Sequence, residues 1–267
     1  MFSDKPRADE LATPLRVDLN ADLGEYSTGT AGDDSDAELM PLVSSANIAC
    51  GGHAGDEGVM RQTLLLARTH GVSAGAHPSF QDREGFGRRD MELPAVEVEA
   101  LVRQQIAGLA AIARVEGIRL RHVKPHGALY NLAARDQAIA DAVARATASV
   151  DPSLILFGLA GSALLAAGWR AGLQTASEVF ADRAYRADGS LVPRHEPGAL
   201  VDNPVVAAAR VLGMIRERSV PAIDGTRIAL EVDTICVHGD TPGATDLARS
   251  LRAALFDAGI DVKAVGA

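Results

Sequence analysis

Ionisable side chains recur at the ends of short apolar segments of this sequence, in positions that suit proton transfer or metal binding. These residues are Asp22, His53, His77, Lys124, His126 and His238. Histidine has the ordinary pKa nearest neutrality, so a group of histidines suits general acid–base chemistry or metal ligation. A buried structural network is the alternative, but so many ionisable groups would be a costly way to fill a core. We therefore interpret the group as catalytic.

Three of these segments alternate polar with apolar side chains. The polar positions are Asp18, Asn20 and Asp22; His122, Lys124 and His126; and Cys236, His238 and Asp240. A period of two indicates a strand with one polar face. Strands of a parallel α/β sheet are normally apolar on both faces, because helices cover the sheet. The interior of a barrel explains the polar faces, since its strand ends line the mouth where such barrels build active sites.

Short β-rich segments alternate with helical patterns along the rest of the chain. The expected strands are 17–22, 46–50, 72–77, 121–126, 154–159, 175–181 and 234–238. The expected helices are 34–45, 56–69, 94–116, 135–148, 161–171, 204–218 and 243–258. This alternation predicts parallel βαβ units and an α/β fold consisting of a single, seven-stranded (β/α) barrel. An open doubly wound sheet is the alternative, and 260–265 is either an eighth strand or a C-terminal extension.

Composition narrows the class of protein. The chain has 267 residues, 47% of them hydrophobic, and a formal net charge of −9. This balance argues against nucleic acid or an anionic membrane surface as a partner, because both attract clustered Lys and Arg. Cys50 and Cys236 are too few for a disulfide framework and indicate a reducing, cytoplasmic compartment. Residues 1–14 are polar and suggest a flexible leader, followed by one domain over 15–267.

Two further features suggest ligand binding. The segment 181–202 is long for a connection and lacks periodicity, which is typical of a lid or binding loop as well as of a plain surface excursion. Arg88 lies on a glycine-flanked loop and could hold a carboxylate or phosphate, with a plain solvated turn as the alternative. A catalytic metal is a separate hypothesis, in which Asp22, His53 and His77 would form an open site of the zinc type.

Read together, the motifs at the strand ends are more specific than any one of them. In order they are VDLNADLGE (17–25), NIACGGHAGD (47–56), GAHPS (75–79) with GFGR (85–88), HVKPHGALYN (122–131), EVFADR (178–183), DGSLVPR (188–194) and TICVHGD (234–240). This series closely resembles the LamB/YcsF family over about residues 15–258. The resemblance implies a seven-stranded barrel related to the polysaccharide deacetylases.

The resemblance also implies a reaction. ATP-dependent 5-oxoprolinase opens the lactam of 5-oxo-L-proline to give L-glutamate, with ATP as co-substrate and with subunits B and C as partners. Lys124 would neutralise phosphoryl charge, and His126 or Asp22 would activate water. The remaining catalytic histidines would orient the substrate or act as alternative bases. The expected substrate-binding residues are Asn20, Arg88, Asp182, Arg183 and Asp240.

Two other functions remain open at this point. A stand-alone, metal-dependent amide or sugar deacetylase would use the same barrel and histidines, but it would need no ATP. A non-catalytic subunit that delivers oxoproline to its partners would bind the ligand even without Lys124 and His126.

Overall fold

The computed structural model describes residues 15–27, 35–238 and 243–267, apart from the side chain of His238. The expected leader 1–14 and the candidate Asp240 lie outside the described residues.

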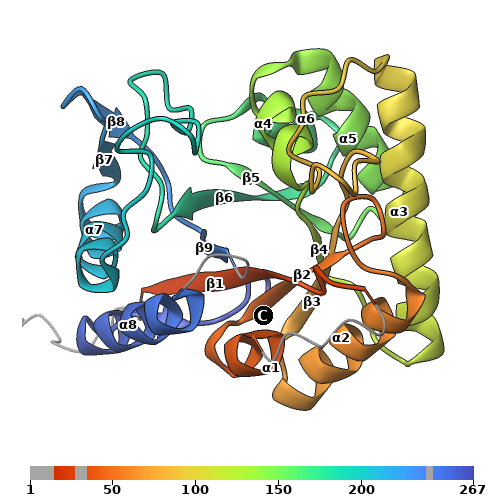
Figure 1. The fold of residues 1–267 in the computed structure, drawn as a ribbon, viewed down its shortest axis with the longest axis horizontal. Coiled ribbons are helices and arrows are strands. Elements are labelled where there is room, and N and C mark those ends of the chain that lie inside the picture. Colours follow the sequence, from red (N-terminus) through yellow and green to blue (C-terminus); the bar gives the residue numbers. More distant parts are fainter. Residues whose placement is uncertain (1–14, 28–34, 239–242) are drawn as a thin grey trace, which may run out of the picture.

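Parallel strands close into a seven-membered ring (Figure 1). The strands of the ring are β1 (Arg16–Leu23), β2 (Ser45–Ala49), β3 (Ser73–His77), β4 (His122–Val123), β5 (Ile155–Leu159), β6 (Gln174–Phe180) and β9 (Thr234–His238). Each pairs with the next in this order, and β9 pairs with both β6 and β1. The expected seven-stranded (β/α) barrel is therefore confirmed, and the open doubly wound sheet is wrong.

Three short strands lie outside this ring. β10 (Asp261–Val262) pairs with the first residues of β1, Arg16 and Val17, and takes no part in closing the barrel. The segment 260–265 therefore adds a C-terminal extension rather than an eighth barrel strand. β7 (Ser219–Pro221) and β8 (Arg227–Ala229) form an antiparallel hairpin that the sequence pattern does not predict.

The helices surround the barrel (Figure 1). They are α1 (Ser35–Leu39), α2 (Glu57–His70), α3 (Ala95–Val115), α4 (Gly127–Arg135), α5 (Gln137–Val150), α6 (Ala163–Arg170), α7 (Pro204–Glu217) and α8 (Ala244–Asp257). α2 shows why the sequence specifies them: the Asp56 carboxylate accepts a hydrogen bond from the backbone of Val59, and Gly71 ends the helix in the left-handed conformation. The expected helix 34–45 is shorter, because α1 passes into a 3₁₀ turn, Met40–Leu42, that contains a proline.

The fourth strand is the main departure from expectation. The sequence pattern predicts 121–126, but regular pairing stops after Val123 because Pro125 has no N–H to donate. The chain still runs beside β3: the Lys124 N–H donates to the Ala76 carbonyl, and the His126 N–H donates to the Pro78 carbonyl. Lys124 and His126 therefore reach the mouth of the barrel from an extended segment beyond a two-residue strand.

The interior of the barrel is polar, as the alternating pattern predicts. Asn20 on β1 donates to Thr234 on the neighbouring strand β9. It also donates to Glu178 on β6, a strand that does not pair with β1. The intervening β1 residues, Leu19 and Ala21, are fully buried in the apolar layer outside the ring. Helices supply that layer, so most of the hydrophobic core lies outside the ring, while polar groups and the Phe157 ring that stacks on His122 occupy the interior.

The long segment 181–202 folds back on itself beside the barrel mouth. Isolated bridges join Arg183 to Leu200 and Tyr185 to Leu191. The Tyr185 hydroxyl accepts a hydrogen bond from the Phe180 backbone at 3.0 Å, which ties the segment to the end of β6. The segment is therefore an ordered wall rather than a plain surface excursion.

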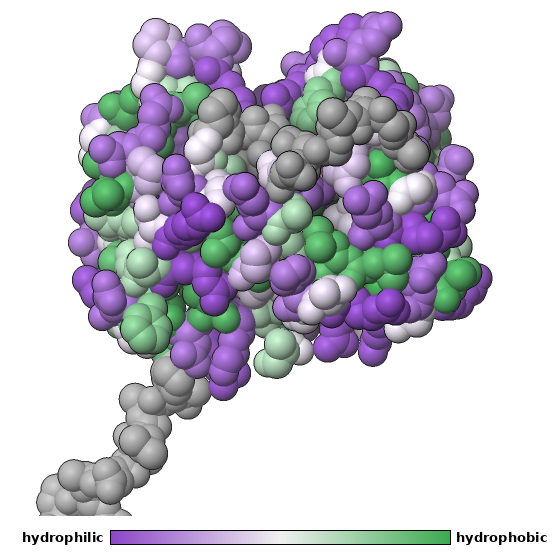
Figure 2. Space-filling view, turned by 60° about the horizontal axis from the view of Figure 1, so that its bottom comes forward, coloured by the Kyte–Doolittle hydropathy of each residue, from purple (hydrophilic) through white to green (hydrophobic). Residues whose placement is uncertain are grey.

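The outer surface mixes side chains of both kinds. Figure 2 shows one face of the molecule, on which hydrophilic side chains are interspersed with hydrophobic ones. Among the residues that the structure describes, no helix has the combination of length and apolar character needed to cross a membrane.

Candidate active site

A cavity of about 620 Å³ opens at the carboxyl ends of the barrel strands. Its polar lining includes Asp22, His77, Arg88, Lys124, His126, Tyr130, Arg183, Arg186, Arg194 and His195. The first six come from the barrel strands and the segments that follow them, and the last four come from the wall formed by 181–202. Four of the residues expected to be catalytic, Asp22, His77, Lys124 and His126, therefore meet the long segment around one space.

Lys124 is a fixed cation in this cavity. Its Nζ lies 2.8 Å from Asp22 Oδ1 and 3.2 Å from Glu178 Oε1, and 2.9 Å from Cys236 Sγ. Burial opposes the charge, but the surrounding acidic groups outweigh it and hold the pKa of Lys124 well above its ordinary value. The ammonium can therefore stabilise negative charge on a ligand but cannot act as a base near neutral pH.

A hydrogen-bonded layer beneath the cavity holds these charges in place. Asn47 donates to Asp22 Oδ1 at 2.8 Å and to Asn20 Oδ1 at 2.6 Å. His122 Nε2 lies 2.8 Å from Asn47 Oδ1, and its ring stacks on Phe157 with a centroid distance of 4.4 Å. Burial lowers the pKa of His122 to about 3, so this imidazole is neutral. The layer fixes the orientation of Asp22 through neutral amides.

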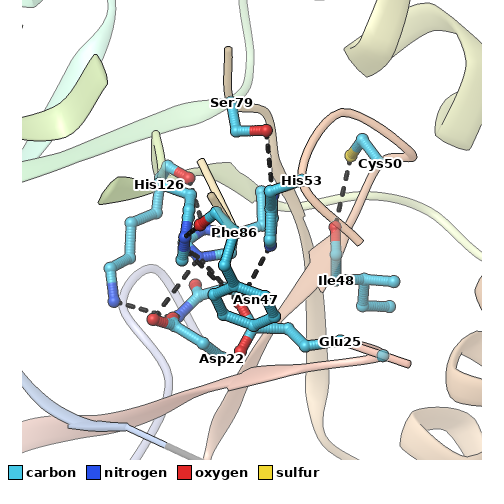
Figure 3. Close-up of polar contacts among 12 residues, drawn as sticks. Asp22, Glu25, Asn47, Ile48, Cys50, His53, Ser79, Phe86 and His126 are labelled. Carbon is cyan, nitrogen blue, oxygen red and sulfur yellow. Dashed lines mark hydrogen bonds and ion pairs between the residues drawn. The ribbon is translucent and has the colours of Figure 1, made fainter. Parts of the chain in front are cut away.

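Four side chains next to Asp22 converge on one point. Glu25, His53, His77 and His126 each direct one carboxylate oxygen or ring nitrogen inward, and these atoms all lie within 4.8 Å of one another. Figure 3 shows Glu25, His53 and His126 gathered beside Asp22. His53 Nε2 is 2.9 Å from Glu25 Oε1, and His77 Nε2 is 3.0 Å from His126 Nδ1. Such a set can hold a metal ion.

Each imidazole of this cluster has a hydrogen-bond partner on its outer side. His53 Nδ1 lies 2.9 Å from Ser79 Oγ. His77 Nδ1 lies 2.7 Å from the Lys124 carbonyl oxygen, and His126 Nε2 lies 2.9 Å from the Phe86 carbonyl oxygen. Burial lowers the pKa of His53 to about 2 and that of His126 well below its ordinary value. These contacts fix both the ring planes and the tautomers.

Two glycines make room for this arrangement. Gly87, at a φ of 66°, packs so closely that an added Cβ would lie 2.9 Å from both His126 Cδ2 and His53 Cβ. A Cβ on Gly52 would meet Ser79 Oγ at 2.4 Å and Gln105 Oε1 at 2.8 Å. The Gly87 backbone can therefore lie directly against His53 and His126, and the Gly52 backbone can lie against Ser79 and Gln105.

The rim of the cavity is cationic although the chain is acidic. Arg88 lies over the Phe86 ring, 4.9 Å from its centroid. Arg183 is buried and donates to the Val192 carbonyl at 2.7 Å, and Arg186 and Arg194 line the cavity from the same segment, 181–202. Because arginine stays protonated, this rim favours an anionic ligand.

Most of the residues proposed from sequence come together here, with some differences in position. Asn20 is fully buried beneath the cavity, where its amide supports Glu178 and Thr234. Asp182 is buried two residues beyond the end of β6 and is not among the residues that line the cavity. His238 ends β9 in register with Asp22, but its side chain lies outside the described part.

Two acidic residues of the site are missed by reasoning from sequence. Glu25 lies within the quoted motif VDLNADLGE, but past the last residue of the alternating strand. Glu178 is fully buried within β6, and the signal that could have found it is a lone carboxylate in an otherwise apolar strand end. For the metal hypothesis, the structure groups His53 and His77 with Glu25 and His126, and it places Asp22 Oδ2 3.4 Å from His77 Nε2.

Comparison with known proteins gives consistent matches over nearly the whole chain. The LamB/YcsF family model matches residues 17–267. A protein of Tolumonas auensis, named as the A subunit of 5-oxoprolinase, is 53% identical over 254 residues, covering 94% of this chain and 99% of its own. A protein of Chloroflexus aggregans with the same name is 55% identical over 250 residues, covering 93% and 98%.

A solved structure agrees with the fold. The crystal structure of the lactam utilization protein from Thermus thermophilus superposes with a TM-score of 0.87 at 47% identity, covering 94% of this chain and all of that one. A deacetylase structure superposes with a TM-score of only 0.43 at 17% identity, a likeness too distant to inform the chemistry.

Proposed function

This chain belongs to the LamB/YcsF family, and from that premise we propose that it is a subunit of an ATP-dependent 5-oxoprolinase. The proposed reaction opens the lactam of 5-oxo-L-proline to L-glutamate while ATP is converted to ADP and phosphate. The observation that carries the proposal is the identity of 53% and 55%, over nearly full length, to two proteins named as the A subunit of 5-oxoprolinase. The enzyme is thus a hydrolase acting on a cyclic amide.

The chemistry needs ATP because a five-membered lactam is a stable amide. Transfer of the γ-phosphoryl group to the lactam oxygen gives ADP and an activated ring carbon. Water then adds to that carbon, the carbon–nitrogen bond breaks, and the ring nitrogen takes a proton. The resulting acyl phosphate reacts with a second water to release phosphate and glutamate. These steps require a cation at the oxygen, a base for water and a site for the substrate carboxylate.

The cavity offers a group for each requirement. Lys124 supplies a buried ammonium for the developing charge on oxygen, held between Asp22 and Glu178. Asp22 faces the cavity and is the carboxylate base that we assign to the attacking water. Arg88 and Arg183 lie on the rim, where either can hold the substrate carboxylate.

We extend the proposal to the cofactor, the partners and the compartment. The word "subunit" in the names of both relatives supports a complex, and we propose that its other members are the B and C subunits. ATP is then a co-substrate of the complex. Both described cysteines are free, which supports a reducing, cytoplasmic location.

Reconstitution tests the proposal directly. An extract that lacks this chain but contains subunits B and C is supplemented with the purified protein, and glutamate released from 5-oxo-L-proline is measured with and without ATP. We expect release only when both the chain and ATP are present. No release, with the partners confirmed present, would contradict the proposal.

A matched pair of variants connects the reaction to the cavity. Asp22→Asn removes the proposed base, and we expect glutamate release to fall at least 100-fold. Asp246→Asn changes an exposed aspartate on α8 and serves as the control, with unchanged release. Normal release by Asp22→Asn would remove this carboxylate from the mechanism.

The histidine–glutamate cluster is the specific observation that favours a second candidate, a stand-alone metal-dependent amide or sugar deacetylase. That enzyme would turn over acetylated amides or sugars with added metal and without ATP or partners. The same purified chain, assayed alone with such substrates, separates the two functions.

A further inference from the structure

We infer that Glu25, His53, His77 and His126 bind one divalent transition-metal ion, in a site that borders the catalytic cavity. The inference goes beyond the proposed lactam chemistry and does not depend on it. It rests on the positions of hydrogen atoms, on the distances among four ligand atoms, and on the support around them.

The outer hydrogen bonds fix where each imidazole carries its hydrogen. A carbonyl oxygen only accepts, so His77 Nδ1 is the protonated nitrogen facing the Lys124 carbonyl. His126 Nε2 is likewise protonated toward the Phe86 carbonyl. Ser79 Oγ donates its own hydrogen to the Phe80 carbonyl at 2.9 Å, so it accepts from His53 Nδ1. In the neutral imidazole, the inner nitrogen of each ring is then the one that carries a lone pair.

These lone pairs face one another and a carboxylate without hydrogens between them. His77 Nε2 and His126 Nδ1 are 3.0 Å apart, and His53 Nε2 is 2.9 Å from Glu25 Oε1. The same glutamate oxygen is 3.4 Å from His126 Nδ1 and 3.9 Å from His77 Nε2. A proton can bridge one such pair but leaves the other contacts repulsive. A cation at the centre satisfies all four atoms at once.

The spacing agrees with metal coordination. Bonds of about 2.0–2.2 Å to a tetrahedral zinc ion place neighbouring ligand atoms about 3.4 Å apart. The four distances given above bracket that value. Three imidazoles and one carboxylate suit zinc and its first-row neighbours, whereas magnesium and calcium prefer oxygen ligands. The chemistry of the donor set therefore points to zinc or to a first-row neighbour such as cobalt.

The surroundings are those of a built site. Outer hydrogen bonds from ligand histidines to carbonyl or hydroxyl oxygens are typical of metal centres, because they fix ring orientation. All three of these histidines are at most 6% exposed. The close approach of Gly87 to His53 and His126 keeps the rings stacked, with centroids 3.8 Å apart.

The ion would lie where it can act on the bound ligand. His77 and His126 also line the cavity, and Asp22 Oδ2 is 3.4 Å from His77 Nε2. A Lewis acid at this wall polarises a carbonyl oxygen or a water molecule. Asp22 and Lys124, which lie beside the cluster, would then supply the base and the cation.

Metal binding can be measured without any turnover assay. The full chain, with any affinity tag removed, is stripped with a chelator, dialysed, and titrated calorimetrically with Zn²⁺. In parallel, Co²⁺ is added and visible absorption is recorded. We expect one equivalent of Zn²⁺, a cobalt absorption band typical of nitrogen and oxygen ligands, and a rise in Tm with Zn²⁺ because the ion binds the folded state.

Variants locate the ion. We expect Glu25→Gln and His53→Gln to weaken Zn²⁺ binding at least tenfold and to remove the cobalt band. His70→Gln, an exposed histidine at the end of α2, is the matched control and should bind like the unaltered chain. Absence of stoichiometric binding by the folded, unaltered chain would overturn the inference, as would cluster variants that bind normally.

The wild-type titration keeps the test decisive even if a cluster variant fails to fold. The result is also separable from the proposed function. Glutamate release by a chain that binds no metal would contradict the metal site and support the 5-oxoprolinase proposal. Tight, cluster-dependent binding by a chain that never restores release would do the reverse.

Discussion

At the scale of single residues, the site depends on charges that are buried only because they are mutually compensated. Lys124 lies between two carboxylates and contacts solvent hardly at all, being 2% exposed. Removing one member of such a group leaves its partners charged in a medium of low dielectric constant. Catalytic and structural effects of mutation are therefore coupled at this position.

Lys124→Met should separate the two effects when it is combined with a second change. The single variant leaves Asp22 and Glu178 buried without their cation. We expect the free energy of unfolding to fall by about 3–5 kcal/mol and glutamate release to be lost. Adding Glu178→Gln should recover part of that stability and none of the activity. Urea denaturation and the release assay measure the two quantities. Recovered activity in the double variant would show that the ammonium is dispensable.

His122 should make stability depend on pH. Its pKa is lowered to about 3 by burial, with Lys124 and His77 adding to the shift and Asp22 opposing it. His122 has an ordinary pKa near 6.5 in the unfolded chain. Between pH 3 and pH 6.5 the unfolded chain therefore binds more protons than the folded chain. Stability is therefore fully present above about pH 6.5, and this one residue removes about 1.4 kcal/mol per pH unit as the pH falls toward 3.

His122→Gln tests this dependence, because it keeps a donor for Asn47 and removes the titration. We expect the stability difference between the original chain and the variant to shrink as the pH falls from 7 to 4.5. Urea midpoints at each pH provide the measurement. A difference that stays constant with pH would show that His122 does not carry this dependence.

At the scale of elements, backbone conformation decides how closely the loops approach the histidines. The loop that contains Phe86 and Gly87 has left-handed backbone at both residues, with φ values of 54° and 66°. That conformation turns the Phe86 carbonyl toward His126 Nε2. The loop is therefore as much a part of the site as the strands are.

Gly87→Ala should lower the free energy of unfolding and glutamate release by more than the left-handed backbone conformation alone explains. An alanine there has both an unfavourable φ and a Cβ 2.9 Å from His53 and His126. Gly172→Ala is the matched control, because Gly172 also has a positive φ, 79°, but nothing within 4 Å of the added Cβ. We expect the control to lose about 1 kcal/mol, in line with the left-handed penalty, and the test variant to lose more. Equal losses in urea denaturation, with equal glutamate release, would contradict a role for the close packing.

Much of this architecture could be predicted from the sequence. The seven barrel strands follow from β-rich segments between helices, and Asp56 and Asn203 mark two helix starts by their capping side chains. Helix α4 was not predicted, because its N-cap, His126, makes no side-chain capping bond and its first residue is a glycine at a φ of 58°. It lacks the usual signals of a helix start.

The site was only partly predictable for a different reason. Alternation identifies residues that share one face of one strand, such as Asn20 and Asp22. It cannot show which loop residue beyond a strand end turns back toward that face, as Glu25 does. It also cannot show that His126 joins His53 and His77, because their meeting depends on loops from three separate strands.

At the scale of the whole molecule, charge is distributed unevenly. The chain has a net charge of −9, yet the mouth of the cavity carries Arg88, Arg183, Arg186 and Arg194. A local cationic funnel in an acidic surface attracts anions selectively to that mouth. Such steering weakens as salt shortens the Debye length from about 10 Å at 0.1 M to about 3 Å at 1 M.

Salt should therefore raise the KM for 5-oxo-L-proline in the reconstituted enzyme. We expect the rise between 50 mM and 500 mM NaCl to be several-fold, and Arg88→Ala to have a higher KM at low salt with a flatter dependence. Arg249→Ala, an exposed arginine on α8, is the control. A salt dependence that is the same in all three proteins would show that the rim does not steer the substrate.

The closure of β1 against β9 also determines when this protein can become active. It pairs residues 18–22 with residues 234–238, so the first and last strands of the ring are separated by almost the whole chain. Contacts of such long sequence separation are slow to form and raise the contact order. On the ribosome, Asn20 would wait for the last strand before its interior hydrogen bond to Thr234 could form. A nascent chain is therefore expected to remain inactive until synthesis has passed residue 238, and C-terminal truncations before that point should not retain partial activity.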